Sequence, residues 1–128
     1  MPVRKYRVCD SFQKNNFKDS ANAIIDLANS ANLFLNDRSP WALIKDISNK
    51  DVVANDIYSV LESCRIIGVL LNPIVPDLSE RILKQLNIDK SSVNFKNSLH
   101  WGLLNPDNPL PKPSPVMLKI EYNESMNK

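Results

Sequence analysis

The feature that most constrains the fold of this chain is a pair of apolar stripes with a common period. In each stripe, apolar residues recur at alternating steps of four and three, the spacing that places them along one face of an α-helix. The first stripe is Phe17, Ala21, Ile24, Ala28, Ala31 and Leu35, widened by Leu27 and Phe34. The second is Val53, Ile57, Val60, Cys64, Ile67 and Leu71. Each stripe needs a partner to cover it, so the sequence predicts two long helices packed antiparallel.

Local signals place the ends of these helices and predict a third. Ser48, followed three residues later by Asp51, resembles a capping box, and Pro73 should end the second long helix near Asn72. Pro76 suits the first position of a further helix. Asp77 and Glu80 suit the N-terminal end of this helix and Lys84 its C-terminal end. Its expected buried face is Leu78, Ile82 and Leu86. No segment alternates as a strand does, so we expect an all-α helical bundle.

A sharp corner is expected between the two long helices. Ser39 is a suitable N-cap for a short helix with Pro40 at its first position and Trp41 in its first turn. Free backbone amides and the positive end of the helix dipole favour an anion at such a place, and an indole offers a face to a nucleobase. From the residues alone, however, we favour Trp41 as a core anchor between the long helices.

Length and composition limit the class of protein. The 128 residues suit one domain, and a formal net charge of +2 is too small to establish a nucleic-acid partner by itself. The longest apolar run, Ile66 to Leu71, is too short to span a bilayer, so we expect no membrane partner. Cys9 and Cys64 lack nearby His or Cys in metal spacing and are expected to be free thiols. These features predict a protein of the cytoplasm or of an organelle interior.

The C-terminal part of the chain is rich in proline. Five of the nine prolines crowd one stretch: Pro106, Pro109, Pro111, Pro113 and Pro115. They favour extended backbone, and the apolar residues that follow can pack on the bundle or dock on a neighbour. An SH3 ligand at Pro109–Lys112 is a third possibility. We therefore divide the chain into a remnant or linker helix at 1–16, a helical bundle at 17–105 and a proline-rich extended tail at 106–128.

No catalytic or metal site is expected. The single histidine, His100, has no nucleophile placed with it by a recognisable motif, so a structural role is favoured. Asp77 with Glu80 is better explained by the helix dipole than by acid–base chemistry. With only Gly68 and Gly102, the chain has no glycine-rich phosphate loop.

Four segments occur in order along the chain: Ala31-Asn32, Ser39-Pro40-Trp41-Ala42-Leu43-Ile44-Lys45-Asp46, the run from Arg65 to Pro76, and Trp101-Gly102. In this order and at these separations they resemble the C-terminal anticodon-binding domain of bacterial or organellar methionyl-tRNA synthetase. The resemblance covers roughly residues 12–121. It implies a helical bundle that binds the anticodon stem-loop of methionine tRNA and is attached to a catalytic domain.

The resemblance also implies roles for residues of the corner. Trp41 matches the family tryptophan that stacks on an anticodon base, and Pro40 matches the proline that sets its position. Asn36 lies where many family members have an acidic residue, so hydrogen bonding there is expected to differ. Arg38 and Lys45 flank the corner and can meet phosphates, although a solvated charge is the more ordinary role for each.

Several family signatures are missing. The segment before residue 12 lacks the Asn-x-x-x-Arg motif that reads anticodon bases, and the chain lacks the His-Ile-Gly-His and Lys-Met-Ser-Lys-Ser signatures of the catalytic domain and any zinc knuckle. The implied parent enzyme attaches methionine to tRNA using ATP, whereas this chain alone is expected to hold no cofactor. A non-catalytic protein-interaction domain that keeps the same bundle is the alternative function.

Overall fold

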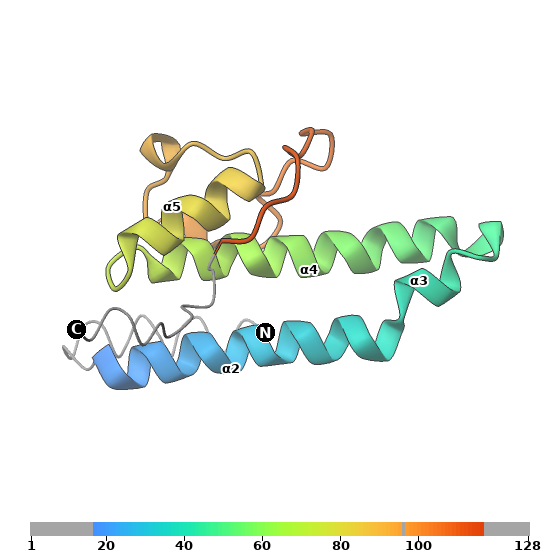
Figure 1. Ribbon diagram of the computed structural model, residues 1–128, viewed down its shortest axis with the longest axis horizontal. Coiled ribbons are helices and arrows are strands. Elements are labelled where there is room, and N and C mark those ends of the chain that lie inside the picture. Colours follow the sequence, from blue (N-terminus) through green and yellow to red (C-terminus); the bar gives the residue numbers. More distant parts are fainter. Residues whose placement is uncertain (1–16, 96, 117–128) are drawn as a thin grey trace, which may run out of the picture.

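Two long antiparallel helices form the frame of the molecule. The computed structural model describes residues 17–95 and 97–116. Helix α2 (Phe17–Arg38) and helix α4 (Lys50–Leu71) each contain 22 residues and lie side by side, connected at one end by the short helix α3 (Pro40–Leu43) and a 3₁₀ turn at Ile47–Asn49 (Figure 1). In the described residues all regular structure is helical, which confirms the predicted all-α fold.

Helix α4 is the central element because it is covered on two sides. Helix α5 (Pro76–Gln85) lies against its C-terminal half, on the side away from α2, and two 3₁₀ turns follow at Lys90–Ser92 and Asn97–Leu99 (Figure 1). The core where these elements meet consists of Ala23, Ile24, Leu27, Ile66, Val69, Leu70, Leu83 and Leu99. It lies near the start of α2 and the end of α4, so the corner formed by α3 is far from the core.

The faces that the helices bury differ from the predicted stripes. In α2 the buried residues are Ser20, Ala23, Ile24, Leu27 and Ala31, whereas Ala28 is exposed. In α4, Ile57 is 42% exposed, whereas Ile66, Val69 and Leu70 are at most 5% exposed. In α5 the buried residues are Ser79 and Leu83, with Leu86 just after its end, rather than Leu78 and Ile82. The helical period of the apolar residues was predicted correctly, but the buried faces were not. Helix α5 and the following loop cover a second face of α4, which a single apolar stripe does not show.

The predicted helix ends are correct at prolines and wrong at Ser48. Pro73 follows the C-cap residue Asn72, and Pro76 opens α5, as expected. Ser48 lies inside the 3₁₀ turn instead of capping α4, and its amide and hydroxyl both donate to Asp46 Oδ1, at 3.0 and 2.8 Å. Asp46 therefore caps the 3₁₀ turn, whereas α4 has Asn49 at its N-cap position with no side-chain capping bond.

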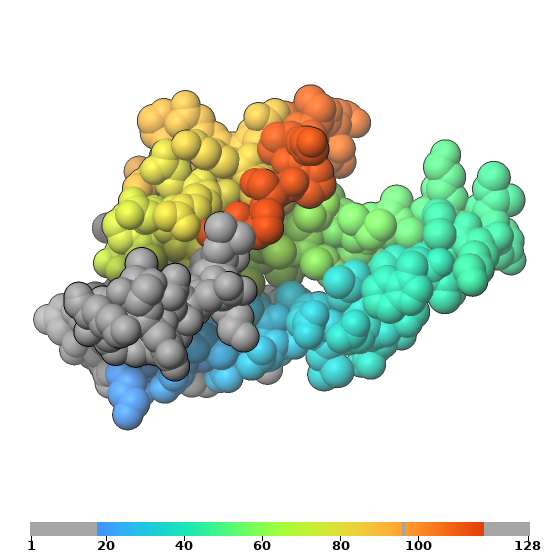
Figure 2. Space-filling view, in the orientation of Figure 1, coloured from blue at the N-terminus to red at the C-terminus, as the bar shows by residue number. Residues whose placement is uncertain are grey.

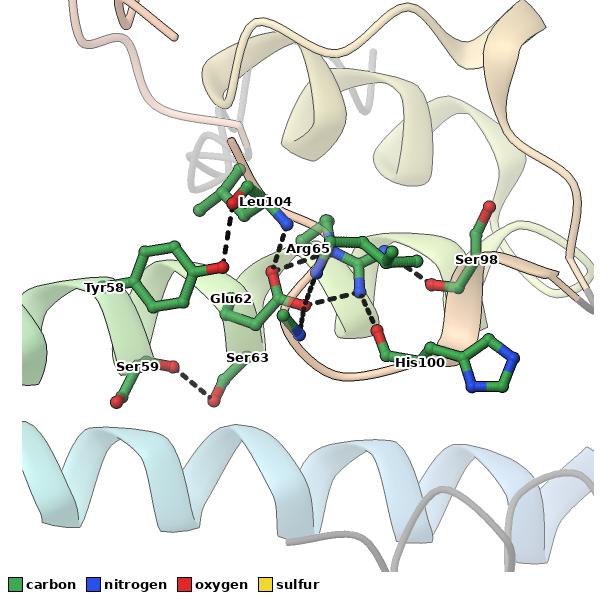
Figure 3. Close-up of polar contacts among 10 residues, drawn as sticks. Tyr58, Ser59, Glu62, Ser63, Arg65, Ser98, His100 and Leu104 are labelled. Atoms are coloured by element: carbon green, nitrogen blue, oxygen red, sulfur yellow. Dashed lines mark hydrogen bonds and ion pairs between the residues drawn. The ribbon is translucent and has the colours of Figure 1, made fainter. Parts of the chain in front are cut away.

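A buried ion pair attaches the loop after α5 to α4 (Figure 3). Arg65 Nη2 lies 2.6 Å from Glu62 Oε1, and the side chains are only 5% and 0% exposed. Glu62 accepts hydrogen bonds from the amides of Gly102, Leu103 and Leu104, while Arg65 donates to the carbonyls of Ser98 and His100. The pair therefore compensates its own burial by bonding the backbone of residues 98–104.

The described part of the proline-rich segment lies beside α5. Residues 109–115 belong to no helix or strand. Gln85 bonds both the hydroxyl and the amide of Ser114, at 2.9 and 3.1 Å, and Arg81 Nη1 donates to the Val116 carbonyl at 3.1 Å. The expected helix at 1–16 and the apolar residues Met117, Leu118 and Ile120 lie outside the described residues, so those expectations and the proposed domain boundaries stay predictions.

Candidate nucleic-acid interface

The candidate site is the corner at which α2 gives way to α3. Helix α2 ends at Arg38, a single residue, Ser39, separates the two helices, and Pro40 begins α3. The Pro40 side chain is buried, whereas the Trp41 side chain, on the next residue, is 57% exposed. In the space-filling view, α3 and the adjoining 3₁₀ turn form a narrow end of the molecule, away from the thicker end that carries α5 (Figure 2).

Ser39 occupies the predicted N-cap position but does not act as the predicted cap. Its backbone is left-handed, with φ 45° and ψ 61°, and its hydroxyl donates 2.7 Å back to the Asn36 carbonyl of α2. The Ser39 carbonyl accepts from the amides of Ala42 and Leu43, at 2.9 and 3.1 Å. Since Pro40 has no amide hydrogen, at most the Trp41 amide is left in this turn, and the anion site expected here lacks its donors.

The exposure of Trp41 contradicts the interpretation of this residue as a core anchor. Two nearby apolar side chains are also exposed, Ile44 by 49% and Ile47 by 85%. Exposed apolar side chains that gather in one place indicate an interaction surface more strongly than isolated ones do. An indole in such surroundings presents a flat apolar face without contributing to the core.

The polar residues predicted for this site differ in what they contact. Arg38 Nε donates to Asp56 Oδ2 at 2.8 Å, an ion pair that joins the end of α2 to α4. Lys45 and Asn36 are exposed. Asp56 was not among the predicted site residues, because a charged residue on a helix is expected to face solvent until its partner is known.

The turn after α3 is held by short polar side chains. Hydrogen bonds from the Ser48 hydroxyl and then from the Ser48 amide lower the pKa of Asp46 below its ordinary value. Asn49 Nδ2 donates to the Leu43 carbonyl at 3.1 Å. These bonds connect the end of α3 to the start of α4, so the corner has a defined backbone although it lacks a core of its own.

Other predicted features are not part of this corner. Cys64 is a free thiol whose pKa burial raises, and Cys9 lies outside the described residues. The His100 carbonyl accepts from Arg65 while its imidazole points away from the ion pair (Figure 3). Within residues 17–95 and 97–116, no three His, Cys, Asp or Glu side chains are grouped so that they could hold a metal ion. None of the helices in that part of the chain combines the length and the apolar character needed to cross a membrane.

Comparisons with known proteins agree with the resemblance seen in the sequence. The chain is similar to methionine–tRNA ligase of Synechocystis sp., with 34% identity over 124 residues that cover 89% of this chain and 23% of the relative. It is 29% identical to the enzyme of Nostoc sp., covering 94% of this chain and 24% of the relative. The chloroplastic/mitochondrial enzyme of Arabidopsis thaliana is also 29% identical, covering 88% of this chain and 19% of the relative.

A family model gives the same result over nearly the whole chain. Residues 2–127 match the family described as the anticodon binding domain of methionyl tRNA ligase. The match extends beyond residues 12–121 at both ends. The chain spans less than a quarter of the length of the three relatives named above. It belongs to the family of methionyl-tRNA ligase anticodon-binding domains.

Proposed function

We propose that this chain binds the anticodon stem-loop of methionine tRNA and that Trp41 stacks on an unpaired anticodon base. The observation that carries the proposal is the exposure of the Trp41 side chain, 57%, next to a buried Pro40 in a corner braced by hydrogen bonds. An exposed indole presents a flat face on which a base can stack. Base–aromatic stacking contributes about 1–3 kcal/mol by alanine substitution.

The neighbouring polar residues support the same role. Lys45 and Arg38 place positive charge on either side of Trp41 in the chain and are positioned to meet the RNA backbone. Asn36 is exposed one turn before the corner and offers a neutral amide to a base or ribose. The proposed mechanism is recognition, with no chemical step assigned to this chain.

The activity of a longer parent enzyme is part of the proposal. The relatives that align with most of this chain are methionine–tRNA ligases, and the aligned region is only 23% and 24% of their length. We propose that the parent attaches methionine to tRNA with ATP, that its catalytic domain is a partner of this chain, and that it acts in the cytoplasm or in an organelle.

The test is a titration with the anticodon stem-loop of initiator methionine tRNA at low salt. Trp41→Ala should weaken binding about 5- to 150-fold, which corresponds to the loss of one stacked base. Trp101→Ala is the matched control, because Trp101 is 49% exposed but lies in the loop held by Glu62 and Arg65. A stem-loop with a scrambled anticodon measures base preference.

Two results would contradict the proposal. Equal loss of affinity in both tryptophan variants would show that Trp41 has no special role. A folded chain that binds no RNA and associates with itself would favour the alternative of a protein-interaction domain, since α2 also exposes Ile25 and Leu33.

A further inference from the structure

We infer that Asp56 is a positioning residue for RNA binding, because it orients the guanidinium of Arg38, three residues before Trp41, to receive a phosphate. The inference rests on the proposed function, and it adds a residue of α4 to a site otherwise made from α2 and α3. The juxtaposition that carries it is the 2.8 Å bond between Arg38 Nε and Asp56 Oδ2 at the end of α2.

The ion pair is asymmetric in its exposure. The Asp56 side chain is only 11% exposed, whereas that of Arg38 is 44% exposed. The carboxylate therefore faces the protein and the guanidinium faces solvent. Seen from outside, the cation of the pair is available and its anion is covered.

The bond also leaves donors free for a ligand. A guanidinium carries five N–H donors in a planar fork, and the bond to Asp56 uses the one on Nε. The two terminal nitrogens form the edge that binds phosphate in a bidentate manner. A carboxylate that fixes the Nε side of the plane reduces the entropy lost when the other edge binds.

Arg38 lies close enough to Trp41 for both to contact one short piece of RNA. Only Ser39 and Pro40 separate them, so their Cα atoms lie at most about 11 Å apart, given 3.8 Å per step. The left-handed Ser39 and its hydrogen bond to Asn36 fix how the two residues are related. Trp41 would then bind a base while Arg38 binds a phosphate of the same strand.

Replacing Asp56 distinguishes an orienting role from simple charge repulsion, because the two predict opposite changes in RNA affinity. If Asp56 acts only as a negative charge near RNA, Asp56→Asn should tighten binding. If Asp56 orients Arg38, the same change should weaken binding at least about threefold, and Arg38→Gln should weaken it about tenfold. Asp37→Asn is the matched control. Asp37 is exposed, and this substitution removes the same charge one residue away from Arg38.

The dependence of affinity on salt distinguishes orientation from loss of stability. Losing one phosphate contact on a single strand should reduce the slope of log K against log salt by about 0.7. We expect this reduction in both Arg38→Gln and Asp56→Asn, and no further loss in the double variant. Partial unfolding would lower affinity without changing the slope, and circular dichroism on each variant measures the folded fraction.

Each outcome bears on one claim. Asp56→Asn that binds as tightly as the unchanged chain, or with an unchanged salt slope, would overturn the inference. If Trp41→Ala also leaves affinity unchanged, the proposed function fails as well. If Trp41→Ala loses binding and Asp56→Asn does not, the proposed function stands and only the role of Asp56 is wrong.

Discussion

Short polar side chains determine the shape of the corner one residue at a time. Ser39 bonds back to α2 through the Asn36 carbonyl, Asp46 accepts from Ser48, and Asn49 donates to the Leu43 carbonyl. Ser and Asp side chains compete well for nearby backbone groups, which is why they occur at such turns. The exposed Trp41 is held by these local bonds rather than by burial.

At this scale we predict how Asp46 titrates. Its pKa should lie below the ordinary value of 3.8, because the Ser48 hydroxyl and then the Ser48 amide bond its ionised form. A pKa that is lower in the folded chain means that ionised Asp46 stabilises the fold above the ordinary value. This stabilisation is lost as the pH falls through the lowered pKa. Carboxyl carbon shifts measured by NMR across an acid titration report the midpoint.

Ser48→Ala provides the control for Asp46. It removes the hydroxyl donor and keeps the amide donor, so the pKa of Asp46 should move back toward 3.8 without reaching it. An Asp46 midpoint that is the same in both proteins would show that the hydroxyl bond is not formed in solution.

Among the elements, the close contact between α4 and α5 depends on one glycine and one serine. A Cβ at Gly68 would lie 3.1 Å from Ile82 Cγ2 and 3.2 Å from Leu83 Cδ2. The Ser79 hydroxyl donates to the Gly68 carbonyl at 2.6 Å and is buried. A small residue on α4 and a small polar residue on α5 thus let the two helices approach each other.

We predict that Gly68→Ala destabilises the fold by about 1 kcal/mol. Overpacking against Ile82 and Leu83 costs about 1–3 kcal/mol, and the higher helix propensity of alanine returns about 1 kcal/mol. The urea midpoint at constant m-value measures the difference. Asn55→Ala, on an exposed position of α4, should leave stability equal or slightly higher. A stabilised Gly68→Ala protein would show that α5 moves away at little cost.

The period of apolar residues was enough to predict the elements but not all of their contacts. It gave α2, α4 and α5, and the proline rules gave the ends at Asn72 and Pro76. It missed the inward-facing Glu62, Arg65 and Asp56, because a charged residue reads as solvent-facing until its partner is known. The exposure of Trp41 was also beyond the pattern, since an indole suits a core and a surface equally.

At the scale of the whole molecule, the end that carries α5 (the thick end) and the corner at α3 are stabilised by different means. The thick end has the apolar core and the Glu62–Arg65 pair, which bonds residues 98–104 to α4 (Figure 3). The corner has the Arg38–Asp56 pair and turn hydrogen bonds. A change that loosens the thick end should therefore lower stability without altering the RNA binding that we propose for the folded corner.

Substitution of the buried ion pair tests this separation. Arg65→Met leaves Glu62 buried without its counterion and should cost about 3–5 kcal/mol, as should Glu62→Gln, which leaves the Arg65 charge unpaired. The double variant should cost less than the sum of the two, because it leaves no unpaired buried charge. Urea unfolding measures the free energies, and hydrogen exchange at Gly102, Leu103 and Leu104 should accelerate in either single variant. RNA affinity per folded molecule should stay unchanged; a loss of affinity at full folding would mean that the loop and the corner are coupled through α4.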